Sequence, residues 1–206
     1  MSDSRDDALA LLRERGFIQQ VTDETALRSL LGAGQMTFYA GFDPTAASLH
    51  VGSLIPLMAM AHLARAGHRA IAVLGGGTTM VGDPSGKTEL RQLSTQETIQ
   101  GNRRQIEPQV RRIIGEDATV VDNADWLLPL NYIQFLRDVG RHFSVNRMLA
   151  AEAYKLRLEK GLSFIEFNYQ LLQAYDFWRL HHDRGCTLQL GCHRRMRSSG
   201  AAARAA

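Results

Sequence analysis

The chain has 206 residues, of which 45% are hydrophobic, and a formal net charge of +3, so it suits one domain, or one and a fraction, with a sizeable core. The charge is too small to indicate nucleic-acid binding by itself. A polar N-terminus, two cysteines and no long apolar run exclude a signal peptide, a disulfide framework and a membrane span, and we expect a cytoplasmic protein without membrane contact.

The first half of the chain alternates helix and strand patterns. Two helices are predicted over Asp3–Arg15 and Asp23–Leu31, because each begins with a capping residue type and is followed by glycine. A strand over Met36–Phe42 has aromatic and β-branched bias. A helix from Ser53 to Ala66 and a buried strand over Arg69–Leu74 complete a strand–helix–strand unit, which implies parallel strands.

Polar loops leave the carboxyl ends of both strands, over Asp43–Ser53 and Gly75–Lys87. In parallel sheets ligands bind beyond these ends, so we expect the two loops to share one cleft. The sequence therefore predicts an α/β fold with a Rossmann-like parallel sheet and flanking helices.

The second half is mostly helical. A long helix is predicted from Ser94 to Gly115, begun by its first residue with a glutamate three residues on, the spacing of a capping box. A short strand follows over Thr119–Val121, and Asn131–His142 and Arg147–Lys160 have helical patterns.

The first loop carries Thr45, His50 and Ser53 where a helix begins, and free N–H groups there favour a polyphosphate. Its sequence over Gly41–Ser53, GFDPTAASLHVGS, resembles the HIGH signature of class I aminoacyl-tRNA synthetases in the form found in bacterial tyrosyl-tRNA synthetases. Ser53 stands where that pattern has its second histidine. It is polar but cannot carry charge.

The resemblance implies that ATP is a substrate, accompanied by Mg²⁺, with no metal site in the protein. His50, Ser53 and Thr45 are the implied catalytic residues. They stabilise charge as pyrophosphate leaves. Lys87 and Arg91 could add positive charge from the second loop, and solvated surface is an equal alternative. The implied ATP-binding residues are Gly41, Asp43, Thr45, His50, Gly52 and Ser53.

The second loop contains Gly82–Thr88, which has some features of a phosphate-binding P-loop. That motif needs four residues between its glycines, and here there are three, including Pro84, which has no N–H. The segment is similar instead to G-D-P-S-G-K of the tyrosyl-tRNA synthetases. There the aspartate, Asp83 here, binds the amino group of tyrosine. The alternative for Asp83 is a turn residue before proline.

A third pattern lies in a predicted helix that begins near Ser163. Tyr169, Gln173 and Asp176 share one face, which could be solvated or could bind a small polar ligand. The resemblance implies that Tyr169 and Gln173 hold the amino group of tyrosine, and that Asp176 and Tyr39 bind its phenol hydroxyl. An apolar face is predicted to pack into the core and comprises Phe164, Phe167, Leu171, Tyr175 and Trp178.

Histidines and cysteines near the C-terminus do not match a zinc site. Their spacing fits no closed C-x-x-C pattern, and we expect no metal there. These residues are His181, His182, Cys186, Cys192 and His193.

The resemblance ends at Gly191. Beyond it the chain is rich in arginine, alanine and serine, a composition that predicts disorder. We therefore expect a truncated catalytic domain with its connecting helices over residues 1–191 and a disordered tail, outside the family pattern, over 192–206.

The implied function is that of a tyrosine–tRNA ligase, which activates L-tyrosine with ATP and transfers it to tRNA(Tyr). Whether this chain is an enzyme stays open, because the expected truncation would leave it not fully competent. The alternative is a non-catalytic tyrosine-binding or dimerisation module.

The implied partners are L-tyrosine, ATP and tRNA(Tyr), with tRNA binding doubtful for this chain. A homodimer is implied as well, through the apolar residues of 131–147, namely Tyr132, Phe135, Leu136, Phe143 and Val145. The arginine pairs of the long helix predict a solvated face, with a tRNA contact as the minor alternative, and comprise Arg103, Arg104, Arg111 and Arg112.

Overall fold

The structure is a computed structural model that describes residues 6–82, 94–150, 154–155, 158, 161–192 and 201–205. Its described elements, in chain order, are α1 (Asp6–Glu14), β1 (Ile18–Val21), α2 (Glu24–Gly32), β2 (Thr37–Phe42), η1 (Val51–Ser53), α3 (Leu54–Arg65), β3 (Arg69–Leu74), α4 (Gly76–Val81), α5 (Gln96–Ile114), β4 (Thr119–Asp122), α6 (Ala124–Leu127), α7 (Tyr132–Asp138), η2 (Gly140–His142), α8 (Val145–Ala150), α10 (Phe164–Arg184), β5 (Cys186–Cys192) and β6 (Ala201–Ala205).

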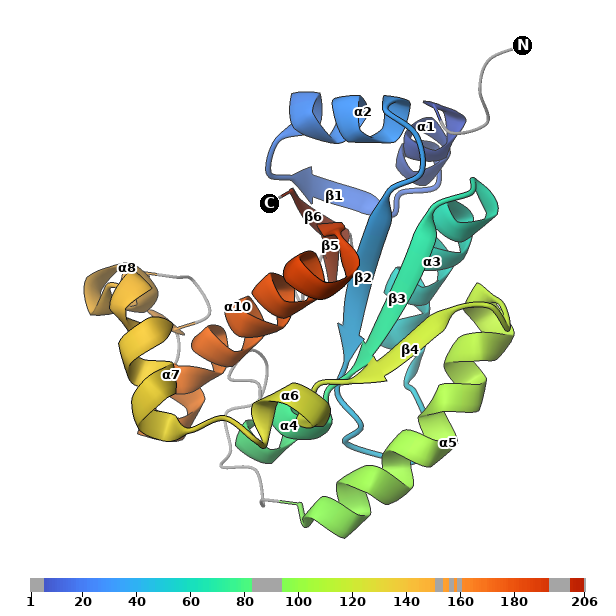
Figure 1. Cartoon of the computed structure of the whole chain (residues 1–206). Helices are drawn as coiled ribbons and strands as arrows, with labels where there is room; N and C mark the ends of the chain where they lie inside the picture. Colours follow the sequence, from blue (N-terminus) through green and yellow to red (C-terminus); the bar gives the residue numbers. More distant parts are fainter. Residues whose placement is uncertain are drawn as a thin grey trace.

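Four parallel strands in the order β5-β2-β3-β4 make up one side of a six-stranded sheet whose full order is β1-β6-β5-β2-β3-β4. The chain moves outward from β2 to β3 and β4, and then returns to place β5 on the other side of β2. Ligands in such sheets bind where the strand order reverses, beyond the carboxyl ends. The predicted parallel sheet with flanking helices is confirmed (Figure 1).

Alternation of side chains along the strands divides the core in two. Phe38 and Ala72 lie in a cluster with residues of α1, α2, α3 and α5. Tyr39 and Ile71 point to the other face, where they pack with Leu180 of α10. Figure 1 shows α3 and α5 on one side of the sheet, with α10, α4 and α6 on the other. Of the residues that the sequence assigns to tyrosine, Tyr39 therefore faces α10, and Tyr169, Gln173 and Asp176 belong to α10 itself.

A strand near the C-terminus differs from the prediction of a disordered tail. β6 pairs antiparallel with β5 through Leu188–Ala205 to Cys192–Ala201. It also pairs in parallel with β1, which the sequence did not predict. Backbone hydrogen bonds do not require apolar side chains, so a segment with a composition typical of disorder can pair with an open sheet edge. Residues 193–200 of the predicted tail lie outside the described residues.

The glycine-rich stretch after β3 was predicted as a loop, but it begins with helix α4. Gly76, Gly77 and Thr78 donate their backbone N–H groups to the side chains of Asp122 and Asn123. These tertiary contacts satisfy the start of the helix and outweigh the low helix propensity of glycine.

Two predicted helix boundaries also differ. The N-cap of α5 is Thr95, whose side chain accepts from the backbone N–H of Thr98, so the predicted capping box at Ser94 and Glu97 is wrong. The helix predicted over 131–142 is interrupted at Val139, where α7 ends and η2 follows. Of the helix predicted over 147–160, α8 is described and most of the remainder lies outside the described residues.

The apolar face predicted for α10 is only partly in the core. Leu171 is buried, but Phe164 is 69% exposed and Trp178 is 51% exposed. Helical spacing therefore identified the face but not which of its residues the rest of the chain covers. None of the described helices is long and apolar enough to span a membrane.

Candidate active site at the strand ends

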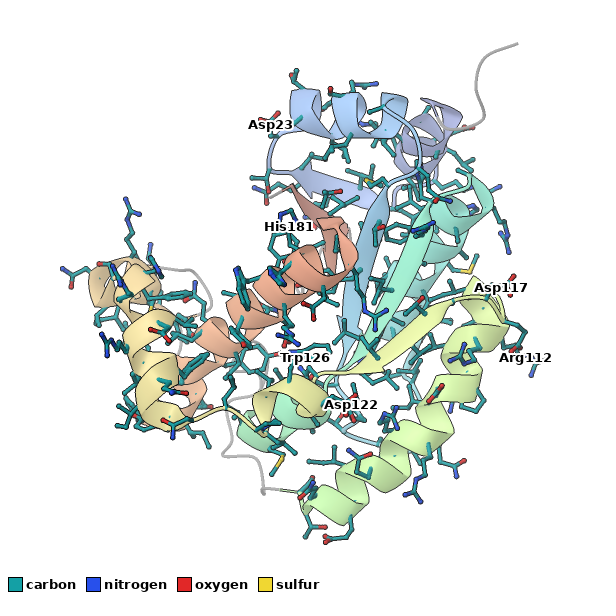
Figure 2. The ribbon with its side chains drawn as sticks, in the orientation of Figure 1. Asp23, Arg112, Asp117, Asp122, Trp126 and His181 are labelled. Carbon is teal, nitrogen blue, oxygen red and sulfur yellow. The ribbon has the colours of Figure 1, made fainter. Side chains whose placement is uncertain are left out.

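The loops after β2, β3 and β4 begin at one edge of the sheet. Gly75 donates its backbone N–H to the carbonyl of Phe42 at 2.9 Å, and Asn123 donates to that of Leu74 at 3.1 Å. These bonds continue the strand ladder for one more residue and bring the three loops together. Figure 2 labels Asp122 and Trp126 at this edge, below α10.

Asp176 of α10 is a buried carboxylate, only 5% exposed. Trp126 donates its indole N–H to Oδ1 at 2.7 Å, and Asn123 donates Nδ2 to Oδ2 at 2.9 Å. Burial raises the pKa of Asp176 to about 7, opposed by these two bonds and assisted by the charges of Asp43 and Asp122. The carboxylate is thus held by two donors from the segment that follows β4, in a place where an unpaired oxygen is costly.

The amide of Asn123 has one orientation that satisfies all its contacts. Its Oδ1 accepts from the backbone N–H of Gly77 at 2.8 Å. Its Nδ2 donates both to Asp176 and to Thr78 Oγ1, the latter at 3.0 Å. The hydroxyl of Thr78 then donates to Asp43 Oδ1 at 3.0 Å. A continuous hydrogen-bond network therefore joins the loops after β2, β3 and β4 to α10.

Close approach to carboxylates explains two glycines after β3. A Cβ on Gly75 would lie 2.1 Å from Asp43 Oδ1, and one on Gly76 would lie 2.3 Å from Asp122 Oδ1. Both distances are shorter than any side chain permits, so this turn can carry no larger residue without moving an acidic group of the site.

Arg103 was predicted to lie on a solvated helix face, but it contacts Asp122 at the end of β4. The Arg103 guanidinium is 3.2 Å from Asp122 Oδ2 and pairs with Glu107. Arg111 is half-buried and contacts Glu107 and two backbone carbonyls. Helical spacing predicts that these arginines share a face, but it does not predict which acidic residues contact that face. Arg104 and Arg112 are exposed, as predicted.

The three residues predicted on one face of α10 have different surroundings. Asp176 is buried, whereas the hydroxyl of Tyr169 lies 3.5 Å from Asp43 Oδ2. Gln173 is exposed. Tyr39 of β2 is buried and stacks on Phe177, the neighbour of Asp176, with ring centroids 5.9 Å apart. The structure therefore brings Tyr39, Tyr169 and Asp176 to the site and leaves Gln173 at its surface.

The residues predicted to face ATP lie in the loop after β2. Thr45 and His50 are exposed, and Ser53 is buried at the end of η1. A Cβ on Gly52 would lie 2.9 Å from the ring of His50. Any larger residue at position 52 would therefore displace that ring. Gly41 has open space around its Cα. Asp83, Lys87 and Arg91 lie outside the described residues.

Sequence reasoning missed Asn123 and Trp126. Both follow β4, just as Asp43 follows β2, and polar residues after a strand were the signal used for the other loops. Among the described residues, no group of three or more histidines, cysteines or acids could hold a metal ion.

Both the sequence and the structure are similar to those of known proteins. The model of a family described as tRNA synthetases class I (W and Y) matches residues 32–192. A tyrosine–tRNA ligase of Desulfosudis oleivorans is 61% identical over 186 residues, which cover 88% of this chain and 43% of that protein. One of Clostridium botulinum is 60% identical over 183 residues, 87% of this chain and 45% of that protein.

The chain therefore spans less than half the length of these curated relatives. Among solved structures, a C-terminally truncated mitochondrial tyrosyl-tRNA synthetase of Aspergillus nidulans superimposes with a TM-score of 0.79 at 31% identity. The match covers 90% of this chain and 56% of that one.

Proposed function

Because the chain belongs to the tRNA synthetases class I (W and Y), we propose that its strand-end site binds L-tyrosine and ATP and joins them as tyrosyl-adenylate. Relatives at 60% and 61% identity are tyrosine–tRNA ligases, which favours tyrosine as the amino acid. Transfer to tRNA(Tyr) is proposed for the longer protein that these relatives represent. ATP and tRNA are both available in the cytoplasm, and we propose that compartment.

The buried carboxylate of Asp176 is the observation that carries this proposal. Trp126 and Asn123 hold its two oxygens in place, and each oxygen keeps acceptor capacity for a further donor. A phenol hydroxyl entering between β2 and α10 can supply that donor, with Tyr39 on the neighbouring strand as its second partner. Phenylalanine fits the same space but leaves the carboxylate without the added bond, which is unfavourable in a buried site.

The amino group of tyrosine is proposed to lie nearer the start of α10. Tyr169 and Asp43 contact each other there, and Gln173 is one helical turn from Tyr169 on the same face. Asp83 is proposed as the carboxylate that pairs with the ammonium.

Activation requires no nucleophilic side chain. An oxygen of the tyrosine carboxylate attacks the α-phosphorus of ATP, a new C–O–P linkage forms, and the bond to the bridging oxygen breaks as pyrophosphate leaves. Thr45, His50 and Ser53 are proposed to donate to the phosphates, where they stabilise the charge that develops. Gly41, Asp43 and Gly52 complete the proposed nucleotide contacts.

Magnesium is proposed to arrive with ATP as part of the substrate, bound by its phosphates. Lys87 and Arg91 are proposed to add positive charge on the same side. Both follow β3 in the chain, and β3 ends beside β2.

A homodimer is proposed as well. Apolar side chains of α7 and α8 face solvent, including Ile133 at 69%, Tyr132 at 57% and Val145 at 56% exposure. Phe135 is buried and Phe143 half-buried, so only part of the predicted interface residues is available. Exposed apolar surface of this kind is typical of an interaction face.

Tyrosine-dependent exchange of labelled pyrophosphate into ATP tests the proposed activation directly. We expect exchange with tyrosine and none without it. Tyr169→Phe, which removes the hydroxyl near Asp43, should weaken tyrosine binding, whereas Tyr132→Phe on exposed α7 is the matched control. Calorimetric binding of tyrosine with no exchange would reject activation by this chain, and no binding at all would reject the assigned site.

A further inference from the structure

The loop that carries His50 has little regular structure of its own. Residues 43–50 lie between β2 and η1 without helix or strand. Two backbone bonds are internal to the segment and the turn that follows it, from Thr45 N–H to Asp43 and from Ser53 N–H to His50. Most of its remaining backbone polar groups must find partners elsewhere or in water.

Helix α5 supplies these partners through two side chains on one face. Asn102 donates Nδ2 to the carbonyl of Pro44 at 3.0 Å. Gln109, two helical turns further along, donates Nε2 to the carbonyl of Ala47 at 3.2 Å. Its Oε1 accepts from the backbone N–H of Leu49 at 3.2 Å and from Ser48 Oγ at 3.3 Å. The loop is therefore bound to α5 at both ends of residues 44–49.

The orientation of the Gln109 amide is determined by its neighbours. Both hydrogens of Nε2 are used, one on Ala47 and one on the carbonyl of Gln105 at 2.9 Å. Rotation of the amide by half a turn would place its NH₂ against the N–H of Leu49 and its oxygen against two carbonyls. The Gln109 amide therefore fits only a loop backbone that presents the carbonyl of Ala47 and the N–H of Leu49 in this arrangement.

α5 is itself attached to the site. Gln100 donates to Asp122 Oδ2 at 3.1 Å, and Arg103 pairs with the same oxygen. Asp122 in turn accepts from the N–H of Gly76. The helix therefore connects the loop after β2 with the loops after β3 and β4.

We propose that Gln109 is a positioning residue for the nucleotide half of the site. By holding the carbonyl of Ala47 and the N–H of Leu49, it sets the backbone that leads into His50 and so aims the polar groups that face the phosphates. The nucleotide part of this inference rests on the proposed function, whereas the hold on the loop does not.

Hydrogen exchange at the Leu49 amide, followed by NMR in the whole chain, tests the hold without any ligand. In Gln109→Ala we expect exchange at Leu49 to be faster by about tenfold, since a bond of this kind is lost. Gln105→Ala, an exposed glutamine one turn earlier on the same helix, is the matched control and should exchange as the unaltered chain does.

Calorimetry with ATP and with L-tyrosine then separates positioning from general loss of structure. We expect Gln109→Ala to weaken ATP binding by about tenfold and to leave tyrosine binding within about twofold. Equal Leu49 exchange in Gln109→Ala and Gln105→Ala would overturn the proposal, as would unchanged ATP affinity in a variant with faster exchange. If the unaltered chain does not bind ATP, the proposed function fails, and Leu49 exchange still decides whether Gln109 holds the loop.

Discussion

Asp176 makes the stability of the folded chain depend on pH. Burial raises its pKa to about 7 in the folded chain, whereas an aspartate in an unfolded chain titrates near ~3.9. Between these values the folded state keeps a proton that the unfolded state has released. The contribution of Asp176 to the free energy of unfolding therefore falls as pH rises from about 4 to about 7.

The variant Asp176→Asn tests this pH dependence, because asparagine has the shape of aspartate but no group that ionises. The free energy of unfolding of Asp176→Asn, relative to the unaltered chain, should rise by about 2 kcal/mol from pH 5 to pH 8. Urea unfolding at the two pH values measures the difference, and all other titrating groups cancel between the two proteins. A difference that does not change with pH would show that Asp176 ionises as an exposed carboxyl does.

Residue patterns in the sequence identified Asp43, Tyr169 and Asp176, which the structure places around one hydrogen-bond network. They did not identify Asn123, which joins that network together. Its role depends on simultaneous contacts with Gly77, Thr78 and Asp176. Those contacts arise only when three loops meet, and no local spacing of residues records them.

Elements that depend on local chemistry were predictable, and those that depend on tertiary contacts were not. The strand over residues 69–74 was predicted at its observed bounds, because a short apolar run between two glycines is typical of a buried strand. Helix α4 was missed because side chains of Asp122 and Asn123, far along the chain, satisfy its first N–H groups. Glycine propensity alone favours a loop there.

The start of α5 offers a test at the scale of one element, since two adjacent hydroxyl residues compete for the N-cap. Thr95 Oγ1 accepts from the N–H of Thr98 at 3.2 Å. Thr95→Ala should therefore reduce the free energy of unfolding by about 1 kcal/mol, and Ser94→Ala should change it by only a few tenths. Thermal unfolding of the two variants gives the comparison. Equal losses, or a larger loss for Ser94→Ala, would restore the capping box that the sequence suggested.

At the scale of the whole molecule, β6 connects the N-terminal β1 to the central sheet. Deletion of residues 193–206 removes this connection, so exchange of the amides of 18–21 should become faster, by about tenfold or more. Amides of Tyr39 and Ala40, which lie between β3 and β5, should keep their protection and serve as the internal control. If the amides of 18–21 exchange equally fast with and without the segment, the pairing of β6 with β1 is not formed in solution.

The proposed dimer can be tested through the exposed face of α7. Ile133→Asp places a charge at a position with 69% exposure, which costs little in a monomer but is unfavourable in an apolar interface. We expect sedimentation of the unaltered chain as a dimer and of Ile133→Asp as a monomer. Leu54→Asp, at an exposed apolar position of α3, should stay dimeric, and a monomeric unaltered chain at micromolar concentration would contradict the proposal.

Recognition of a phenol hydroxyl by the buried carboxylate of Asp176 is the central claim, and paired calorimetry measures it most directly. L-Tyrosine and L-phenylalanine are titrated into the unaltered chain and into Asp176→Asn at pH 8, where the carboxylate is ionised. We expect the unaltered chain to bind tyrosine more tightly than phenylalanine by about tenfold or more, and the variant to lose most of that preference. Equal affinities for the two amino acids in the unaltered chain, or an undiminished preference in Asp176→Asn, would contradict the assignment.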